Sequence, residues 1–278
     1  VGSVPSAMIP GLMIASNEFH VFPLLGTYYA NFNLSGCDGI GGMTRDIGLR
    51  DNTVFCNVNL RKALALAIDR DALTEALAAG QVPAAGFIPP GFTDNNGDDF
   101  FDTSKNDSDI VSDDGSYALA VTHFQTAANE LYPAAATPAA ALALLVAEMN
   151  TKEYAYNTSE GHKQIAELLQ GMWFDNLGFT IQLTNEEWAL FQVTRTEGDY
   201  DIARGGWLTD FMDPSGMLGI FTQGNAYNDP DYNNPAFEAK IEAAQSATTA
   251  AAHFTALYEA HAIFMGDMPV VPIYHYND

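Results

Sequence analysis

The clearest hydrophobic pattern in the chain predicts a strand, a helix and a second strand in succession. Residues 153–157 and 179–183 have the composition of short strands, and the apolar residues between them recur at the 3.6-residue spacing of a helix. The apolar face of this helix consists of Ile165, Leu168, Leu169, Met172, Trp173 and Leu177. Thr158 or Ser159 would cap the helix, and Gly178 would end it. A unit of this length implies parallel strands joined by a right-handed crossover.

Similar patterns predict further helices and strands on both sides of this unit. Helices are expected at residues 61–70, from Asp69 or Asp71 to Ala79, at 117–148 with breaks near Pro133 and Pro138, at 186–195, and as a pair within 234–266. Strands rich in aromatic and β-branched residues are expected at 18–33, 200–204 and 269–276. The mixture of helices and strands predicts an α/β fold.

Cys37 and Cys56 lie in a polar, glycine-rich segment, and residues 34–57 are interpreted as a loop insertion. The spacing of the two cysteines fits neither a zinc site nor a redox pair. A disulfide is one interpretation, which would add about 3 kcal/mol on a chain-entropy estimate, and two free thiols are the alternative. A disulfide would argue for an oxidising compartment outside the cytoplasm.

The charge balance narrows the classes of partner. The chain has 35 acidic and 11 basic residues and a formal net charge of -24, which is the wrong sign for nucleic acid or an anionic membrane surface. The acidic run at residues 94–114 lacks the glycine spacing and the closing glutamate of an EF-hand, so a solvated loop is favoured over a calcium site. No apolar run has the length of a membrane span, and no secretion signal stands in this chain.

Catalytic signatures are missing from the sequence, which contains no G-x-S-x-G, H-E-x-x-H or phosphate-loop motif. We therefore expect no enzyme activity, no catalytic residue, no cofactor and no metal site. The histidines are scattered, and His162 stands out because it falls in the first turn of the helix that follows residues 153–157.

Residues 187–214 concentrate the side chains that suit ligand binding. They include Trp188, Arg195, Arg204, Trp207 and Asp210, together with a glycine pair, Gly205 and Gly206, at the expected end of a strand. Ligands of open α/β folds bind beyond the carboxyl ends of strands, so this segment is a candidate binding site. In the alternative interpretation the tryptophans belong to the core and the arginines pair with surface acids.

The same segment carries a resemblance to the oligopeptide-binding proteins of ABC importers. The matching motifs extend over most of the chain: Gly26-Thr27-Tyr28-Tyr29, the run from Arg61 to Arg70, Tyr156-Asn157-Thr158-Ser159-Glu160-Gly161-His162-Lys163, Asn176-Leu177-Gly178, Glu187-Trp188, the run from Gly198 to Trp207, Asp210, Asp213-Pro214 and the run from Met268 to Tyr274.

The resemblance implies a three-domain protein that closes around its ligand. Residues 1–278 would form a single large C-terminal lobe of the periplasmic-binding-protein-like class II fold, with a mixed sheet flanked by helices. Residues 20–33 and 269–277 would be the hinge strands through which the chain enters and leaves this lobe, and the N-terminal lobes are absent from this chain.

The resemblance also implies roles for ten side chains. Asp210 matches the aspartate that receives the α-ammonium of the peptide, and Trp207 and Trp188 match tryptophans that line side-chain pockets. Arg195, Arg204 and His162 match residues that can meet the C-terminal carboxylate of peptides of different lengths. The remaining positions that match ligand-proximal residues are Asn157, Tyr29, Gly206 and Tyr276.

The implied function is the extracytoplasmic binding of oligopeptides and their delivery to the permease subunits of an ABC transporter, by a monomer that is periplasmic or lipid-anchored at the cell surface. Alternatives on the same fold are another solute (a dipeptide, a cell-wall peptide, a nickel chelate or a sugar), a peptide-signal receptor or an adhesin. A peptidase is the alternative from a different class, and no nucleophile with a positioned base supports it. The segment between Cys37 and Cys56, the Ala-rich helix and the lack of a lysine near Ala79 depart from the family pattern, which leaves the preferred peptide length open.

Overall fold

A six-stranded mixed sheet forms the centre of the molecule, in a computed structural model that describes residues 8–15, 20, 22–41, 53–104 and 117–277. The strands lie in the order β2-β6-β1-β5-β3-β4. β1 is antiparallel to both β5 and β6, whereas β3 is parallel to both β4 and β5. Their bounds are β1 Pro23–Phe32, β2 Val82–Pro83, β3 Glu153–Asn157, β4 Gln182–Glu186, β5 Ile202–Leu208 and β6 Val270–Asn277. The predicted mixed α/β sheet is therefore confirmed.

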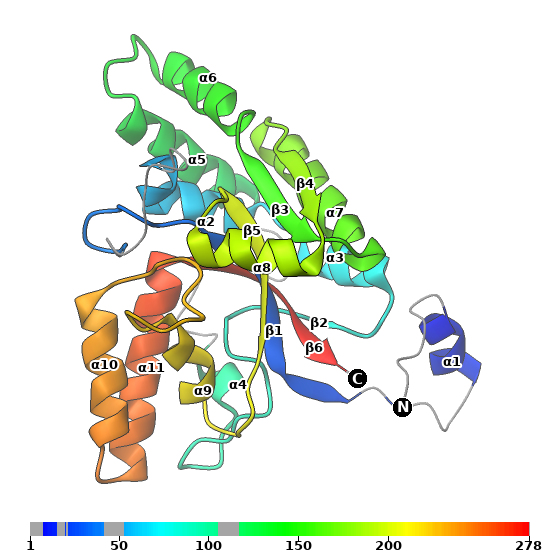
Figure 1. The fold of residues 1–278 in the computed structure, drawn as a ribbon, viewed down its shortest axis with the longest axis vertical. Helices are drawn as coiled ribbons and strands as arrows, with labels where there is room; N and C mark the ends of the chain where they lie inside the picture. Colours follow the sequence, from blue (N-terminus) through cyan, green and yellow to red (C-terminus); the bar gives the residue numbers. More distant parts are fainter. Residues whose placement is uncertain (1–7, 16–19, 21, 42–52, 105–116, 278) are drawn as a thin grey trace.

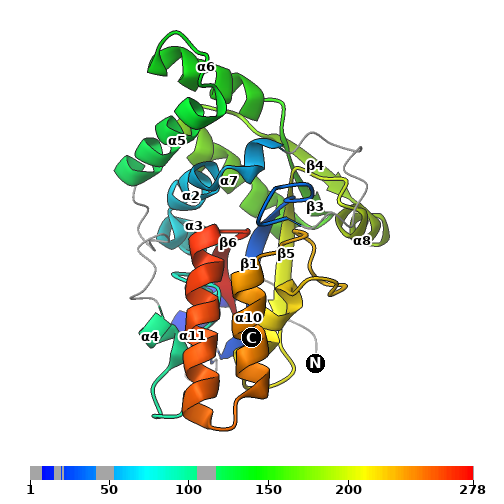
Figure 2. The same ribbon diagram turned by 90° about the vertical axis from the view of Figure 1, so that its left-hand side faces the viewer.

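Helices surround the sheet in two groups (Figure 1). The long strands β1, β5 and β6 extend between an upper group, which contains α2, α5, α6, α7 and α8, and a lower group, which contains α4, α9, α10 and α11. The helix bounds are α1 Ile9–Ala15, α2 Val58–Leu66, α3 Arg70–Leu77, α4 Phe100–Ser104, α5 Tyr117–Leu131, α6 Pro138–Met149, α7 Glu160–Leu177, α8 Trp188–Glu197, α9 Ser215–Leu218, α10 Pro235–Ser246 and α11 Ala250–Asp267, with short 3-10 helices η2 Thr53–Cys56 and η4 Gly219–Phe221. Figure 2 shows α10 and α11 side by side below the α5–α6 pair.

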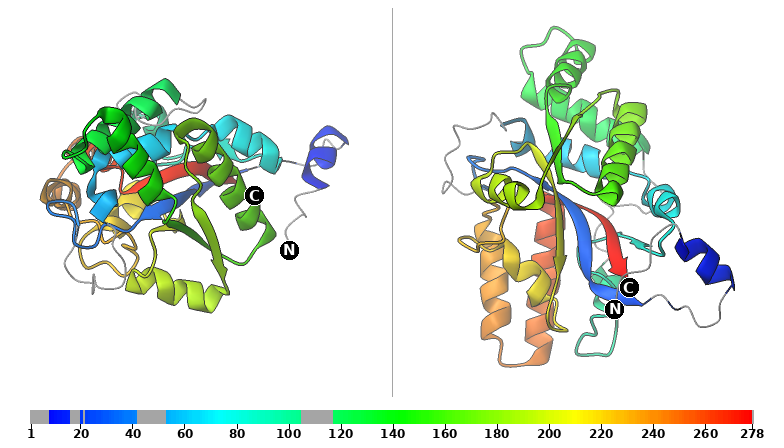
Figure 3. Two further views of the ribbon diagram at one scale, coloured as in Figure 1. Left: turned by 90° about the horizontal axis from the view of Figure 1, so that it is seen from above. Right: turned by 45° about the vertical axis from the view of Figure 1, so that its right-hand side comes forward.

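The β3-α7-β4 unit confirms the strand–helix–strand pattern and its parallel strands. The predicted apolar face of α7 is turned inward: Ile165, Leu169, Trp173 and Leu177 are buried, and the helix ends at Gly178 in the left-handed conformation, at φ 80°. From β4 the chain returns through α8 to β5 on the other side of β3. Because both crossovers are right-handed and run in opposite directions, α7 and α8 cover opposite faces of the sheet (Figure 3).

Two predicted strands are displaced along the sequence. β4 begins at Gln182 and not at Phe179, because Phe179 and Ile181 are buried before the strand starts, with the Phe179 ring packed on Trp173 at 6.2 Å between centroids. Burial in a connection gives the same apolar signal as burial in a strand. β5 runs from Ile202 to Leu208, beyond the predicted 200–204, so the glycine pair Gly205 and Gly206 lies inside the strand and not at its end.

Helix boundaries differ from the prediction by a few residues. α3 ends at Leu77 because Ala78 adopts the left-handed conformation, at φ 52°, so the helix stops before the expected Ala79. Asp69 caps α3, with its side chain accepting a hydrogen bond from the Ala72 N–H. α8 begins at Trp188, two residues after the predicted 186, because Glu186 completes β4.

Two buried arginines hold the first helices against the last helix and strand. The guanidinium of Arg61 in α2 donates hydrogen bonds to the carbonyl oxygens of Asp267, Met268 and Phe55. Arg70 at the start of α3 donates to the carbonyl oxygens of Pro272, Ala65 and Ile68. Each guanidinium therefore ties its own helix to main-chain carbonyl groups at the end of α11 or in β6.

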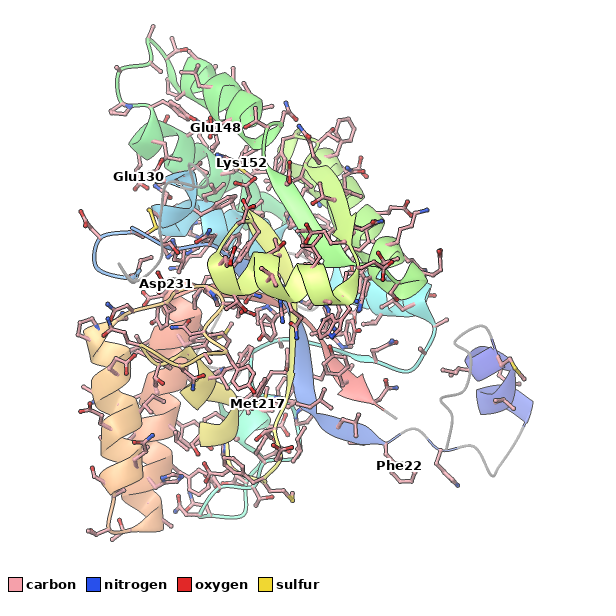
Figure 4. All side chains as sticks on the ribbon, in the orientation of Figure 1. Phe22, Glu130, Glu148, Lys152, Met217 and Asp231 are labelled. Atoms are coloured by element: carbon pink, nitrogen blue, oxygen red, sulfur yellow. A yellow bond between two sulfur atoms is a disulfide. The ribbon has the colours of Figure 1, made fainter. Side chains whose placement is uncertain are left out.

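Smaller contacts fix the upper and lower groups. At the junction of α6 and β3 the Lys152 ammonium lies 2.8 Å from the Glu148 carboxylate (Figure 4). In the lower group Met217 of α9 is fully buried, and α9 contacts both α10 and α11 (Figure 4). Cys37 and Cys56 form a disulfide within the loop segment 34–57, of which residues 42–52 lie outside the described residues. Of the two interpretations of the cysteines, the structure therefore contains the bonded one.

Candidate ligand-binding site

A hollow of about 210 Å³ opens between β5, α8 and the loop that follows η4. Its lining residues are Tyr29, Trp188, Gln192, Arg195, Thr196, Gly206, Trp207, Ala226, Tyr227 and Asp229. Five of the ten predicted site residues are among them: Tyr29, Trp188, Arg195, Gly206 and Trp207. The hollow lies beside β5, and α8 and the loop at residues 226–229 supply most of its other lining residues.

Two tryptophans line this hollow. Trp188 is the first residue of α8 and keeps 48% of its surface exposed, so its indole is available to a ligand. Trp207 in β5 is held in place because its Nε1–H donates to the Gly216 carbonyl at 2.8 Å and its ring lies 4.9 Å from the ring of Tyr227. Trp188 is thus half exposed, whereas Trp207 is partly buried and packs against the hydrophobic core.

Arg195 forms an ion pair at the wall of the hollow. Its Nη1 lies 3.1 Å from Oδ2 of Asp229, and its Nη2 donates to Oε1 of Gln192. The guanidinium also lies over the rings of Trp188, at 5.9 Å, and Phe191, at 5.2 Å. Arg195 is thus positioned by α8 and already paired with a carboxylate.

Arg204 lies in a different environment, a cluster of aromatic hydroxyl groups next to the hollow. Its guanidinium lies 5.2 Å from the Tyr28 ring centroid and 3.5 Å from the Tyr276 hydroxyl. Burial raises the pKa of Tyr28 and Tyr276, so both phenols are neutral. The Nε of Arg204 is buried without a hydrogen-bond partner within the described ranges, and no ion pair joins Arg204 to a carboxylate there.

His162 and Asn157 are not among the residues that line the hollow. His162, in the first turn of α7, approaches the Tyr28 hydroxyl with Nδ1 at 3.3 Å. Burial, followed by the nearby charge of Arg204, lowers the pKa of His162 to about 4, so its imidazole is neutral at physiological pH. Asn157 ends β3, and its buried Oδ1 has no hydrogen-bond partner in the part of the chain that the structure describes.

Gly206 lines the hollow and also lies next to the Tyr276 hydroxyl in the cluster around Arg204. A Cβ atom at this position would collide with the Tyr276 hydroxyl, and a Cβ at Gly205 would collide with the Tyr29 ring. The glycine pair thus lets the rings of β1 and β6 approach β5 closely.

Asp210 is the predicted residue that the structure places apart. It is exposed two residues beyond the end of β5, and it is not among the residues that line the hollow. The Thr209 N–H before it donates to the Leu25 carbonyl, and the Asp213 side chain after it accepts from the Ser215 N–H. The segment that carries Asp210 is therefore fixed on both sides, and the carboxylate itself faces solvent.

Sequence reasoning missed Asp229, Gln192, Tyr227 and Tyr28 as residues of the site. Tyr28 stands in a quoted motif, but nothing in the sequence distinguishes it from a core tyrosine. Asp229 lies in the segment Asn225–Asn234, which is rich in asparagine and aspartate and reads as an ordinary loop. Its position becomes visible only when the loop folds against α8.

The described residues contain neither a metal-ligand cluster nor a membrane-spanning helix. No group of three or more His, Cys, Asp or Glu side chains in the described ranges is arranged to hold a metal ion. In the acidic run at 94–114, Asp94 accepts hydrogen bonds from the Asn96 and Asp98 N–H groups, while residues 105–114 lie outside the described residues. Within the same ranges, every helix is too short or too polar to cross a bilayer.

The fold thus places a hollow lined by aromatic and charged side chains beside a mixed α/β sheet. The chain belongs to the bacterial extracellular solute-binding proteins, family 5, whose sequence profile, described as the family's middle part, matches residues 7–229. This family consists of binding proteins.

Relatives and solved structures agree with this family. The oligopeptide-binding protein OppA of Bacillus subtilis is 30% identical over 283 residues, which cover 100% of this chain and 45% of that protein. The murein tripeptide binding protein MppA of Escherichia coli is 28% identical, with a TM-score of 0.72 over 99% of this chain and 47% of that structure. Haemophilus influenzae OppA in complex with the peptide RPPGFSPFR is 25% identical, with a TM-score of 0.73 over 99% of this chain and 48% of that structure. The chain spans about half the length of the curated relatives it matches, 45% in the case of B. subtilis OppA.

Proposed function

We propose that this chain is the larger ligand-binding lobe of an extracytoplasmic oligopeptide-binding protein that delivers peptides to the permease subunits of an ABC transporter. The observation that carries the proposal is the free edge of β5. β3 pairs with β5 at Ile202 and Ala203, and the next residues of β3, Tyr156 and Asn157, pair with β4. Within the part of the chain that the structure describes, the edge of β5 from Arg204 to Leu208 is thus left without a neighbouring strand on the side away from β1. An extended peptide can pair with such an edge through its main chain, whatever its sequence.

The charges at the two ends of this edge suit the two ends of a peptide. Arg204 stands at the start of the free edge, and the exposed carboxylate of Asp210 follows its end. At a strand rise of about 3.3 Å per residue, their Cα atoms lie at most about 20 Å apart, the length of a peptide of roughly four to six residues. Asp210 would bind the α-ammonium group and Arg204 the terminal carboxylate, each through a charge-assisted hydrogen bond. The neutral His162, with Asn157 and Tyr276, would contribute hydrogen bonds and no charge.

The wider arrangement supports the same proposal. β1 and β6 pair along the middle of the sheet, and their outer ends meet because Pro23 pairs with Asn277. Adjacent, antiparallel strands at 20–33 and 269–277 suit a hinge through which the chain enters and leaves a C-terminal lobe. The Cys37–Cys56 disulfide suits an oxidising compartment, and two relatives, OppA and MppA of Escherichia coli, are periplasmic proteins. We further propose that the protein acts as a monomer without catalytic activity.

Substitution of Asp210 tests the proposed function in the full-length protein. Asp210→Ala should weaken the binding of a free-amine peptide by about tenfold or more, because a hydrogen bond to a charged group contributes about 1.5–3 kcal/mol. The same peptide with an acetylated amine should bind both forms equally weakly in titration calorimetry. Asp175→Ala, at an exposed position of α7 away from the site, is the matched control. Unchanged affinity of the Asp210→Ala protein for free-amine peptides would contradict the assignment.

A further inference from the structure

We infer that Asp229 is a specificity-determining residue, which neutralises Arg195 so that the hollow accepts an uncharged, aromatic side chain of the peptide and disfavours an acidic one. This inference rests on the proposed function and concerns the same site. It separates two arginines that the sequence alone treats as equivalent.

The carboxylate of Asp229 is held in place by its own backbone. The Asp229 N–H donates to the Tyr227 carbonyl at 2.9 Å, and its carbonyl oxygen accepts from the Tyr200 hydroxyl at 2.6 Å. Tyr200 is almost fully buried, so this anchor belongs to the core of the lobe. The loop therefore presents the Asp229 side chain to α8 in a fixed position.

The ion pair with Arg195 is largely shielded from water. The side chains of Arg195 and Asp229 are only 13% and 10% exposed, and their charged atoms lie 3.1 Å apart. Charges in such surroundings are screened weakly, and a partner that is removed leaves an uncompensated charge behind. Arg195 and Asp229 together thus add no net charge to the lining of the hollow.

A ligand carboxylate that approached Arg195 would also meet the negative charge of Asp229 at nearly the same distance. The attraction and the repulsion would then largely cancel, while the carboxylate would lose its hydration. Arg204 differs because neutral phenols, and no described carboxylate, surround it. A terminal carboxylate should therefore go to Arg204, and Arg195 should act only as part of the wall.

The remaining walls of the hollow suit an aromatic side chain. Tyr29, Trp188, Trp207 and Tyr227 supply four rings around a space of about 210 Å³. A flat ring of the ligand can stack on these walls, and the guanidinium of Arg195 lies 5.9 Å from the centroid of the Trp188 ring.

Charge-changing variants of the full-length protein test this inference. The probes are penta-alanine peptides with free termini in which a single Phe, Gln or Glu is placed at each position in turn. For the wild-type protein, titration calorimetry should find one position at which Phe binds most tightly and Glu binds at least tenfold more weakly than Gln. Asp229→Asn should reduce the ratio of the Gln-peptide affinity to the Glu-peptide affinity at least tenfold at that position alone, because the positive charge of Arg195 then has no negative partner in Asp229.

A second variant reverses the charge and keeps the test decisive if Asp229→Asn folds poorly. Arg195→Gln leaves Asp229 uncompensated and should raise the affinity for a peptide with Lys at the same position at least fivefold relative to Gln. Asp231→Asn is the matched control: Asp231 follows Asp229 by two residues in the same loop (Figure 4), and its φ of 56° suits asparagine. The control should leave every ratio unchanged.

The outcomes separate this inference from the proposed function. If the Gln-to-Glu and Lys-to-Gln affinity ratios are the same in the wild type and in both variants, the role of Asp229 is wrong, and peptide binding by the protein is unaffected. A wild-type protein that binds none of the peptides would overturn both.

Discussion

At the scale of single residues, His253 ties the segment that carries Asp210 to the lower helices. Its Nδ1 lies 2.9 Å from the Ala244 carbonyl at the end of α10, and its Nε2 lies 2.8 Å from Oδ2 of Asp213. Both ring nitrogens thus face acceptors, an arrangement that only the doubly protonated imidazolium satisfies fully. Burial alone would lower the pKa of His253, but the hydrogen bonds to Ala244 and Asp213 outweigh it and raise the pKa.

The stability that His253 contributes should depend on pH with a definite sign. A histidine whose pKa is raised on folding stabilises the protein fully below its unfolded pKa of about 6.5, and the contribution is lost as the pH rises through the folded value. The free energy of unfolding of His253→Gln should therefore fall furthest below that of the wild type near pH 5 and approach it above about pH 8, as measured by urea unfolding at each pH.

His123 provides the matched control. Burial, followed by the charge of Lys62, lowers its pKa. In that case the wild type should lose stability relative to His123→Gln as the pH falls. A difference between wild type and His253→Gln that stays constant from pH 5 to pH 8 would show that His253 acts through packing alone.

The site residues illustrate which chemistry can be predicted from the sequence. Trp188 and Trp207 were predicted as site residues because they are large aromatic side chains in a segment rich in charged residues, and because they match positions of the family. Both of them line the hollow. Asp229 could not be predicted, because its role depends on a contact between a loop and a helix that lie more than thirty residues apart. The opposite environments of Arg195 and Arg204 depend on the same kind of contact.

At the scale of elements, α2 and α3 show how a predicted helix can conceal a structural function. The run from Arg61 to Arg70 was predicted as one helix, but α2 ends at Leu66 and Arg70 begins α3. The pattern does not reveal that both arginines point into the core, because an arginine at the end of a helical face usually lies in water. Here the carbonyl groups at the end of α11 and in β6 determine their direction.

Loss of the Arg61 guanidinium should destabilise the lobe strongly. Arg61→Met removes the donor to the Asp267, Met268 and Phe55 carbonyls and leaves them buried, which should lower the free energy of unfolding by about 3 kcal/mol in urea. Lys62→Met changes the neighbouring, half-buried residue of the same helix and should cost less than about 1 kcal/mol. Equal losses in the two variants would mean that the carbonyl contacts of Arg61 are of little importance.

The start residues of β4 and β5 could not be predicted from the hydrophobic pattern. The order and type of the elements from β3 to β5 were predicted, but the bounds of β4 and β5 were wrong by two or three residues at their starts. Apolar side chains at Phe179 and Tyr200 are buried by neighbouring helices and loops before either strand begins to pair. Only the register of the sheet determines where pairing starts.

At the scale of the whole molecule, the edge of β5 from Arg204 to Leu208 has no strand paired with it among the described residues. If the proposed lobe closes against another part of a longer protein, the isolated chain should fold and yet bind peptide at least tenfold more weakly than the full-length protein. Circular dichroism and a cooperative thermal transition would establish folding, and titration calorimetry with one pentapeptide would compare the affinities. Equal affinities would mean that the whole site lies within these residues.

The glycine pair in β5 has a consequence for protein engineering. Side chains at Gly205 and Gly206 would displace the rings of Tyr29 and Tyr276, so the floor of the hollow tolerates no added bulk. Mutant libraries that aim to change the preferred ligand should therefore leave Gly205 and Gly206 unchanged. They should vary Gln192, Thr196 and Ala226, which line the hollow and already carry side chains.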